Sequence, residues 1–355
     1  MIKKIALTAL TVCITIGFCT MSLAQKPYRV GTTTANFLEI GLGASGNAMG
    51  DAQVANTNDL MSVYWNPAGL AFMNQSEAQF IKQPYVADIN MTFAGVGLVL
   101  PQIGTLAMGI THMGYGDDMA VTTLERPDGT GEKFGAKDVA FTFSVARRLV
   151  QWFSFGASGK YIHSQIWHTN ASALATDLGA IVHTQFFSSE AYRDDGLKIG
   201  MSISNYGTRM AFEGMDLLQP IDPSPSEQGN YAETRGAYKT TAWELPLIFR
   251  IGIALTKHIS SRQNIALEAD ALHPNNNSEC INLGAQYTFI IPGRGEFFLC
   301  GGYKGLGMSD SIYGSSFGGG FMLPITTQLK VKLDFAYRSL GLLGNSFTYG
   351  FGLLF

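Results

Sequence analysis

The 355-residue chain carries only 14% charged residues, with 24 Lys and Arg against 27 Asp and Glu and a formal net charge of −3. This weak negative charge, without a basic run, excludes an electrostatic surface for nucleic acid. After the first segment, no apolar run approaches the roughly 18 residues of a membrane helix. The 41 glycines and 12% aromatic residues therefore favour a β protein, either a membrane barrel or a large soluble all-β fold.

The first 24 residues read as a secretory signal peptide. Lys3 and Lys4 precede an uncharged apolar run from Ile5 to Phe18, and small residues end at Ala24. We expect cleavage after Ala24, which leaves 22 basic against 27 acidic residues and a net charge of −5. A retained anchor is the alternative, but the run is shorter than a spanning helix.

Residues 25–75 do not alternate and form a separate N-terminal segment. Two blocks stand out, one from Ala48 to Ala52 and one from Trp65 to Leu70. Asn66 has the character of a helix N-cap, and Pro67 then occupies the first helical position, where its missing N–H is harmless. The motif residues are Met49, Gly50, Asp51, Asn66, Pro67 and Gly69.

Residues 76–355 alternate between apolar and polar positions, as strands with two different faces do. In a sandwich the polar face points outward, and in a membrane barrel it points into the lumen, so alternation alone does not separate the two. In the barrel reading, the candidate lumen-facing residues are Lys160, Arg250, Glu268, Asp270, Lys330, Lys332 and Asp334. We expect substitution of lumen residues such as Lys332 to be tolerated.

The spacing predicts about fourteen antiparallel strands. Short connections alternate with long ones, and the two longest span residues 114–137 and 207–240. A barrel produces this sorting because it has short turns on one side of the membrane and long loops on the other. The expected strands begin near Glu77, Asn90, Gly104, Asp138, Trp152, Ala173, Gly196, Thr241, Arg262, Ser278, Gly295, Ser311, Gln328 and Leu343.

One expected strand, which runs from Trp243 to Ile251, contains Pro246 at an inward position. Proline lacks the N–H that a ladder needs, so it belongs at an edge or a bulge. A kink there would open a gap in the barrel wall. A bulge near the rim without a transport role is the alternative.

The last strand ends the chain on an aromatic residue. Tyr349, Phe351 and Phe355 share one wholly apolar face, and the pattern resembles the C-terminal assembly signal of bacterial outer-membrane barrels. This pattern, together with the signal peptide, favours a transmembrane β-barrel in the outer membrane. Its expected partners are outer-membrane lipid and the barrel assembly machinery.

No catalytic, cofactor or metal site is expected. The run from Gly156 to Lys160 has some likeness to a phosphate loop, but Tyr161 replaces the required Ser or Thr. The six histidines lack the short paired spacing of metal ligands. Glu268 and Asp270 share a strand face, as an acid/base pair does, but a solvated lumen lining explains them better.

The run from Phe37 to Ala71 and the strands after it resemble the PorV/PorQ group, which is similar to the wider FadL family of outer-membrane transport barrels. The resemblance implies that the N-terminal segment folds into short helices that plug the barrel. Its polar residues are candidates to meet inward charges, with Asn47, Asp51, Asn58 and Asp59 on the plug and Lys160, Arg250, Lys330 and Lys332 on the wall.

We rank three candidate functions from the most to the least favoured. The resemblance implies a type IX secretion-associated barrel. Such a barrel would bind exported proteins or hand them on, or it would bind a larger translocon. The FadL likeness implies a channel for small hydrophobic solutes. The long connection at 207–240 suits a structural or adhesive surface barrel.

Overall fold

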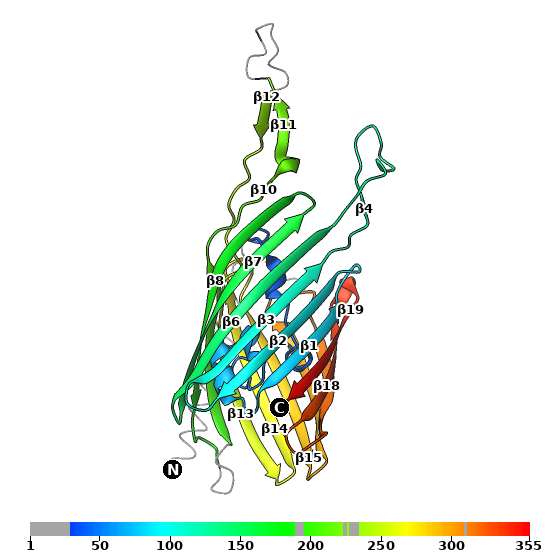
Figure 1. Ribbon diagram of the computed structural model, residues 1–355. Coiled ribbons are helices and arrows are strands. Elements are labelled where there is room, and N and C mark those ends of the chain that lie inside the picture. The colour runs from blue at the N-terminus through cyan, green and yellow to red at the C-terminus, as the bar shows by residue number, and fades with distance from the viewer. Residues whose placement is uncertain (1–28, 189–194, 223–225, 227–233, 309–310) are drawn as a thin grey trace.

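The computed structural model describes residues 29–188, 195–222, 226, 234–308 and 311–355. The expected signal peptide lies outside these residues. Fourteen long antiparallel strands close into a barrel around an N-terminal segment (Figure 1). The wall strands are β1 (Glu77–Pro84), β2 (Asn90–Leu100), β3 (Gly104–Gly114), β6 (Ala136–Val150), β7 (Phe153–Ile166), β8 (Thr169–His183), β9 (Gly196–Gly207), β13 (Ile248–Ser260), β14 (Gln263–Pro274), β15 (Cys280–Ile291), β16 (Gly295–Leu306), β17 (Ser315–Pro324), β18 (Lys330–Ser339) and β19 (Asn345–Leu354).

Neighbours in sequence pair around the ring, and β19 pairs with both β18 and β1 to close it. On β19, Ser346, Thr348 and Gly350 are buried, whereas the alternate positions Tyr349 and Phe351 are exposed. An apolar face that remains exposed is stable only where the surroundings are apolar too, so this pattern is that of a membrane barrel. The predicted fold class and strand number are confirmed.

The two ends of the barrel differ in their connections. Turns of two or three residues join β2 to β3, β6 to β7, β13 to β14 and β15 to β16, and we call this the short-turn end. The connection from β8 to β9, residues 184–195, is longer than expected there. The opposite, long-loop end carries the connections from β3 to β6 and from β9 to β13, and the latter projects far beyond the wall (Figure 1).

The long connections are more ordered than the sequence indicated. The first contains a small hairpin of β4 (Met119–Ala120) and β5 (Lys133–Phe134). The second contains β10 (Glu213–Gly214), which extends the edge of β8, and a hairpin of β11 (Leu218–Ile221) and β12 (Thr234–Ala237).

Pro246 does not kink a wall strand, which corrects the sequence interpretation. β13 begins at Ile248, and its ladder with β9 ends at the pair Ser204 and Ile248. Pro246 therefore precedes the strand, because a residue without an N–H cannot extend the ladder. Its carbonyl accepts a hydrogen bond from the Asn205 side chain at 3.0 Å.

Register shifts occur instead within four wall ladders, β6 with β7, β8 with β9, β13 with β14 and β15 with β16, and the one between β8 and β9 lies beside Pro246. The register shifts between Thr176 and Leu178, and Asn205 opposite adopts a left-handed φ of 65°. Asp177 accepts the backbone N–H of Asn205 at 2.7 Å and pairs with Lys160 at 2.6 Å. The bulge is thus fixed by buried polar contacts.

The N-terminal segment runs through the lumen from the long-loop end to the short-turn end. Thr34 donates its backbone N–H to Glu244 at the first end, and Glu77 begins β1 at the second. None of the helices among the described residues has the length and apolarity to cross a membrane. The helices are η2 (Asn36–Glu39), α2 (Ala44–Ala48), α3 (Ser62–Trp65), η3 (Pro67–Phe72), η4 (Met215–Leu217) and η5 (Gly341–Leu343).

We call residues 35–73 the plug. Most of its apolar side chains are buried, and the largest is Trp65, which is 1% exposed. The Trp65 indole donates to the carbonyl of Leu42 at 3.0 Å, so the polar atom of this buried ring is satisfied. The side chains of Leu42, Leu60, Met61 and Leu70 form one core with Ile81 and Phe93 of the wall.

Candidate functional site

The block that contains Met49, Gly50 and Asp51 forms a tight turn against the wall. Gly50 and Asp51 have left-handed φ angles of 67° and 63°. A Cβ on Gly50 would lie 2.6 Å from the backbone nitrogen of Tyr303, so only glycine fits. Met49 packs with Ala44, Ala48 and wall residues of β16 and β18. The turn aims the Asp51 carboxylate at the barrel wall.

Asp51 joins the plug to two wall strands through buried charges. One carboxylate oxygen pairs with the Lys304 ammonium at 2.6 Å, and the other pairs with the Arg338 guanidinium. Burial alone would raise the pKa of Asp51, but Arg338 and Lys304 outweigh it and hold the pKa below its ordinary value. The carboxylate therefore stabilises the fold fully above its ordinary pKa, and that contribution is lost as the pH falls through the lowered pKa.

Asn47 adds neutral contacts beside this charge cluster. Its amide donates to Gln83 at 3.0 Å and to Thr348 at 2.8 Å, and its carbonyl accepts from Arg338. These partners lie on β1, β19 and β18, so one plug residue bridges the strands where the barrel closes.

Glu268 and Asp270 clamp the backbone of the next plug residues. Asp270 accepts the N–H groups of Gln53 and Val54 at 2.8 and 3.0 Å. Glu268 accepts those of Ala55 and Asn56 at 2.6 and 3.3 Å. Two inward carboxylates two positions apart on β14 thus satisfy four donors of a segment that lacks regular structure. Their arrangement serves as a structural clamp on the plug.

The second motif block, Trp65 to Leu70, is also held in place by hydrogen bonds and close packing. The side-chain oxygen of Asn66 caps η3 by accepting the backbone N–H of Ala68 at 3.1 Å. The side-chain NH₂ of Asn66 donates to the backbone carbonyl of Val54 at 2.8 Å. A Cβ on Gly69 would meet the Thr57 side chain at 2.4 Å. Pro67 opens η3, as its fixed φ favours.

The sequence named candidate groups on the plug and on the wall without assigning pairs, and of these groups Asp59 and Lys332 meet at 2.6 Å. Lys332 also lies 4.0 Å from both Glu77 and Asp334. Since its removal would leave buried carboxylates without their cation, the expectation that Lys332 tolerates substitution does not fit the structure. Lys330 lines the cavity described below.

Within the described part of the chain, the other candidate wall cations form no hydrogen bond or ion pair with the candidate plug residues. Lys160 pairs with Asp177 of the wall, and Arg250 donates to Ser204 at 2.8 Å and lies over the Tyr64 ring. The partners of Asp51 are Lys304 and Arg338, which were not among the predicted partners of the plug. Arg338 continues the inward alternation of Lys332 and Asp334, and that signal could have found it.

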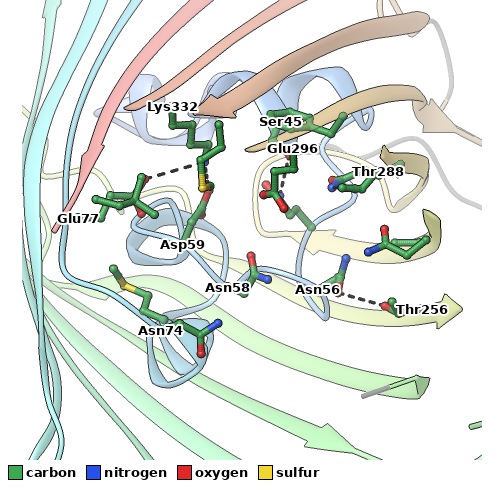
Figure 2. Close-up of a pocket in the computed structure, with 18 of the residues that line it drawn as sticks. Ser45, Asn56, Asn58, Asp59, Asn74, Glu77, Thr256, Thr288, Glu296 and Lys332 are labelled. Atoms are coloured by element: carbon green, nitrogen blue, oxygen red, sulfur yellow. Dashed lines mark hydrogen bonds and ion pairs between the residues drawn. The ribbon is translucent and has the colours of Figure 1, made fainter. Parts of the chain in front are cut away.

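A polar cavity of about 450 Å³, which we call the chamber, lies between the plug and the short-turn end. Its floor is plug chain, including Asn56, Asn58 and Asp59, and its walls come from the short-turn ends of β1, β9 and β13 to β19 (Figure 2). The Lys332 ammonium reaches Asp59 at one side of the chamber, and at another side the Thr256 hydroxyl donates to the side-chain oxygen of Asn56 (Figure 2).

A second concavity lies on the exposed outer face of β2, β3, β6, β7 and β8. It is about 890 Å³ in volume, and exposed residues such as Met108, Phe141, Phe143 and Leu174 line it. Among the described residues, no group of three or more His, Cys, Asp or Glu side chains is placed to hold a metal ion.

Comparison with known proteins gives the family. The family model for the type IX secretion system protein PorV matches residues 23–220, which is more than half of the chain. The chain belongs to the PorV family. It is therefore an outer-membrane barrel, and its short-turn end faces the periplasm. No curated protein sequence matches the chain.

Two solved structures share the barrel fold. The toluene transporter TodX of Pseudomonas putida is 10% identical, with 88% of this chain and 96% of that chain covered and a TM-score of 0.51. The toluene transporter TbuX of Ralstonia pickettii is 11% identical, with 88% and 97% covered and a TM-score of 0.51. At this identity the likeness establishes the fold.

The close approach of plug and wall predicts a steric effect. A Cβ on Gly302 would lie 2.1 Å from the carbonyl carbon of Met49, whereas one on Gly159 would meet nothing within 4 Å. We expect Gly302→Val to displace the plug, and protease cleavage of residues 47–56 in detergent should rise at least tenfold. Gly159→Val is the matched control. Equal cleavage of both variants would contradict the packing described.

Proposed function

We propose that this chain is a type IX secretion-associated outer-membrane component that binds or hands on exported proteins. Membership of the PorV family supports the assignment to that system. The observation that carries the mode of action is the plug, whose Asp51 is 3% exposed and paired with two wall cations. A lumen filled by a fastened plug suits a binding component better than an open pore.

Two measurements in the source bacterium test this function. Deletion of the gene should stop the appearance of type IX cargo at the cell surface and in the medium. Pull-down from native outer membranes should recover large secretion partners. Normal export in the deletion strain, with co-purified lipid and no secretion partner, would overturn the assignment.

The route to the membrane is part of the proposal. The basic start and apolar run of residues 1–24 support export through a cleaved signal peptide. The exposed apolar side chains of the wall support direct contact with outer-membrane lipid, and the terminal strand supports recognition by the barrel assembly machinery.

A hydrophobic-solute channel is the second candidate, and the outer concavity favours it. This concavity shares Thr142 and Lys160 with a small lumen cavity lined by Phe37 and Phe93, so the two lie on opposite sides of one wall region. The structural neighbours TodX and TbuX are titled toluene transporters. Uptake of radiolabelled toluene by the parent strain, lost on gene deletion while export continues, would support this candidate over secretion.

The terminal strand gives a prediction about assembly. Phe355 donates its backbone N–H to Ser76 at 2.9 Å, next to the seam where β19 meets β1. We expect deletion of Phe355, or combined Phe351→Ser and Phe355→Ser, to reduce membrane insertion several-fold. Heat-modifiable mobility and membrane fractionation measure this. Normal membrane-embedded protein would show that the terminal aromatics are dispensable.

A further inference from the structure

The chamber is lined mainly by groups that hydrogen-bond without carrying charge. Seven of its lining side chains are Asn or Gln, and hydroxyls of Ser45, Thr256 and Thr288 lie among them. A carboxamide both donates and accepts, and so does each unit of a peptide backbone. The charged lining residues balance in number, with Lys198, Lys330 and Lys332 against Asp59, Glu77 and Glu296. The lining therefore selects a polar ligand without a strong net charge.

Part of this hydrogen-bonding capacity is unused within the described chain. Asn58 and Asn74 are exposed and Asn264 is half-buried, and the side chains of all three line the chamber without a hydrogen bond to another described residue. The Gln53 carbonyl oxygen is buried without a partner, while its amide donates to Ser45 at 3.2 Å. Unpaired polar groups around one cavity are unfavourable when dehydrated, so they favour a ligand or water that pairs with them.

The position of the chamber limits how a ligand reaches it. It lies at the periplasmic end, and plug residues held by Glu268, Asp270 and Lys332 close its far side. Its volume of about 450 Å³ falls within the range of small-ligand sites, roughly 300–1,000 Å³. A ligand would enter from the periplasm and leave by the same mouth.

We propose that the chamber binds an extended, unfolded peptide segment, whose backbone N–H and C=O groups pair with the lining carboxamides. This inference rests on the proposed function, because the segment would belong to a protein awaiting export. Phe298 is the one Phe, Tyr or Trp among the described lining residues, so the chamber lacks the large stacking surfaces that favour a sugar. The chamber thus holds cargo on the periplasmic side before transfer.

A triple variant tests the proposal directly. Asn58→Ala, Asn74→Ala and Asn264→Ala together remove three unpaired carboxamides and break none of the hydrogen bonds described. The probes are fluorescent 12-residue peptides, tiled from proteins that the source bacterium exports, and an uncharged oligosaccharide mixture. Binding to the full-length purified protein is measured by fluorescence anisotropy. At about 1 kcal/mol for each hydrogen bond, we expect the triple variant to bind the best peptide about a hundredfold more weakly.

The control variant is Asn170→Ala, an exposed asparagine on β8 outside the chamber, which should bind like the parent. A cavity-filling variant, Thr288→Trp, should abolish peptide binding while heat-modifiable mobility stays normal. Equal peptide binding by the parent and the triple variant, or binding of oligosaccharide without peptide, would overturn the proposal.

Export measurements separate this inference from the proposed function. If gene deletion stops export while the triple variant exports normally and binds peptide like the parent, the secretion function stands and the chamber proposal fails. If the deletion leaves export intact while the chamber still binds peptide with the predicted loss in the triple variant, the secretion function fails and the chamber proposal stands.

Discussion

Asp51→Asn should loosen the plug and raise ion conductance through the barrel. The substitution keeps the size of the side chain, and asparagine tolerates the left-handed backbone at this position. It removes the one carboxylate that, among the described residues, pairs with the buried Arg338 guanidinium and Lys304 ammonium. Breaking a buried pair on one side typically costs about 3–5 kcal/mol. We expect planar-bilayer recordings to show openings that are at least tenfold more frequent than in the parent.

Asp118→Asn is the matched control. Asp118 pairs with Lys133 at 2.8 Å, but the two side chains are 86% and 62% exposed, so solvent screens the pair. The same chemical change there should leave conductance and plug proteolysis unchanged. Closed, protease-resistant Asp51→Asn protein would show that the charge cluster does not hold the plug.

Leu333→Arg should destabilise the barrel in a bilayer. Leu333 is exposed on the outer face of β18, where its cross-strand neighbours are Phe321 and Phe351. An Arg on the lipid face near the membrane midplane lowers the stability of a barrel by about 2–4 kcal/mol, because the guanidinium either loses its hydration or carries water into the hydrocarbon. Equilibrium refolding into lipid vesicles measures the free energy of unfolding.

Leu124→Arg provides the comparison, since Leu124 is fully exposed in the connection between β3 and β6. Its substitution should change the free energy of unfolding by less than about 0.5 kcal/mol. Lys332→Ala is unsuitable as a neutral partner because Lys332 holds Asp59. Equal losses for Leu333→Arg and Leu124→Arg would place Leu333 away from lipid.

The sequence alone determined the strands and their two faces, because period-two alternation is a local property of each strand. The basic, apolar start of the chain and the aromatic face of the last strand then favoured a membrane barrel over a sandwich. Phe351 beside Gly350 already indicates opposite faces, and short turns indicate which strands are neighbours. The same logic indicated Lys332, Asp334 and Asp270 as inward residues, and these positions are buried in the structure. It also placed Asn66 as a cap with Pro67 after it, as observed.

Only the tertiary structure decided which inward groups meet the plug. Asp51 and Arg338 are 287 residues apart in the sequence, and their contact depends on the depth and the orientation of the plug within the lumen. Alternation could not place Pro246, because the apolar pattern of Trp243 to Ile251 begins before the strand does. The strand β13 itself begins only at Ile248. The chamber, too, is decided by the tertiary structure alone. Its lining comes from the plug and nine wall strands, and strand periodicity carries no information about the space that remains between them.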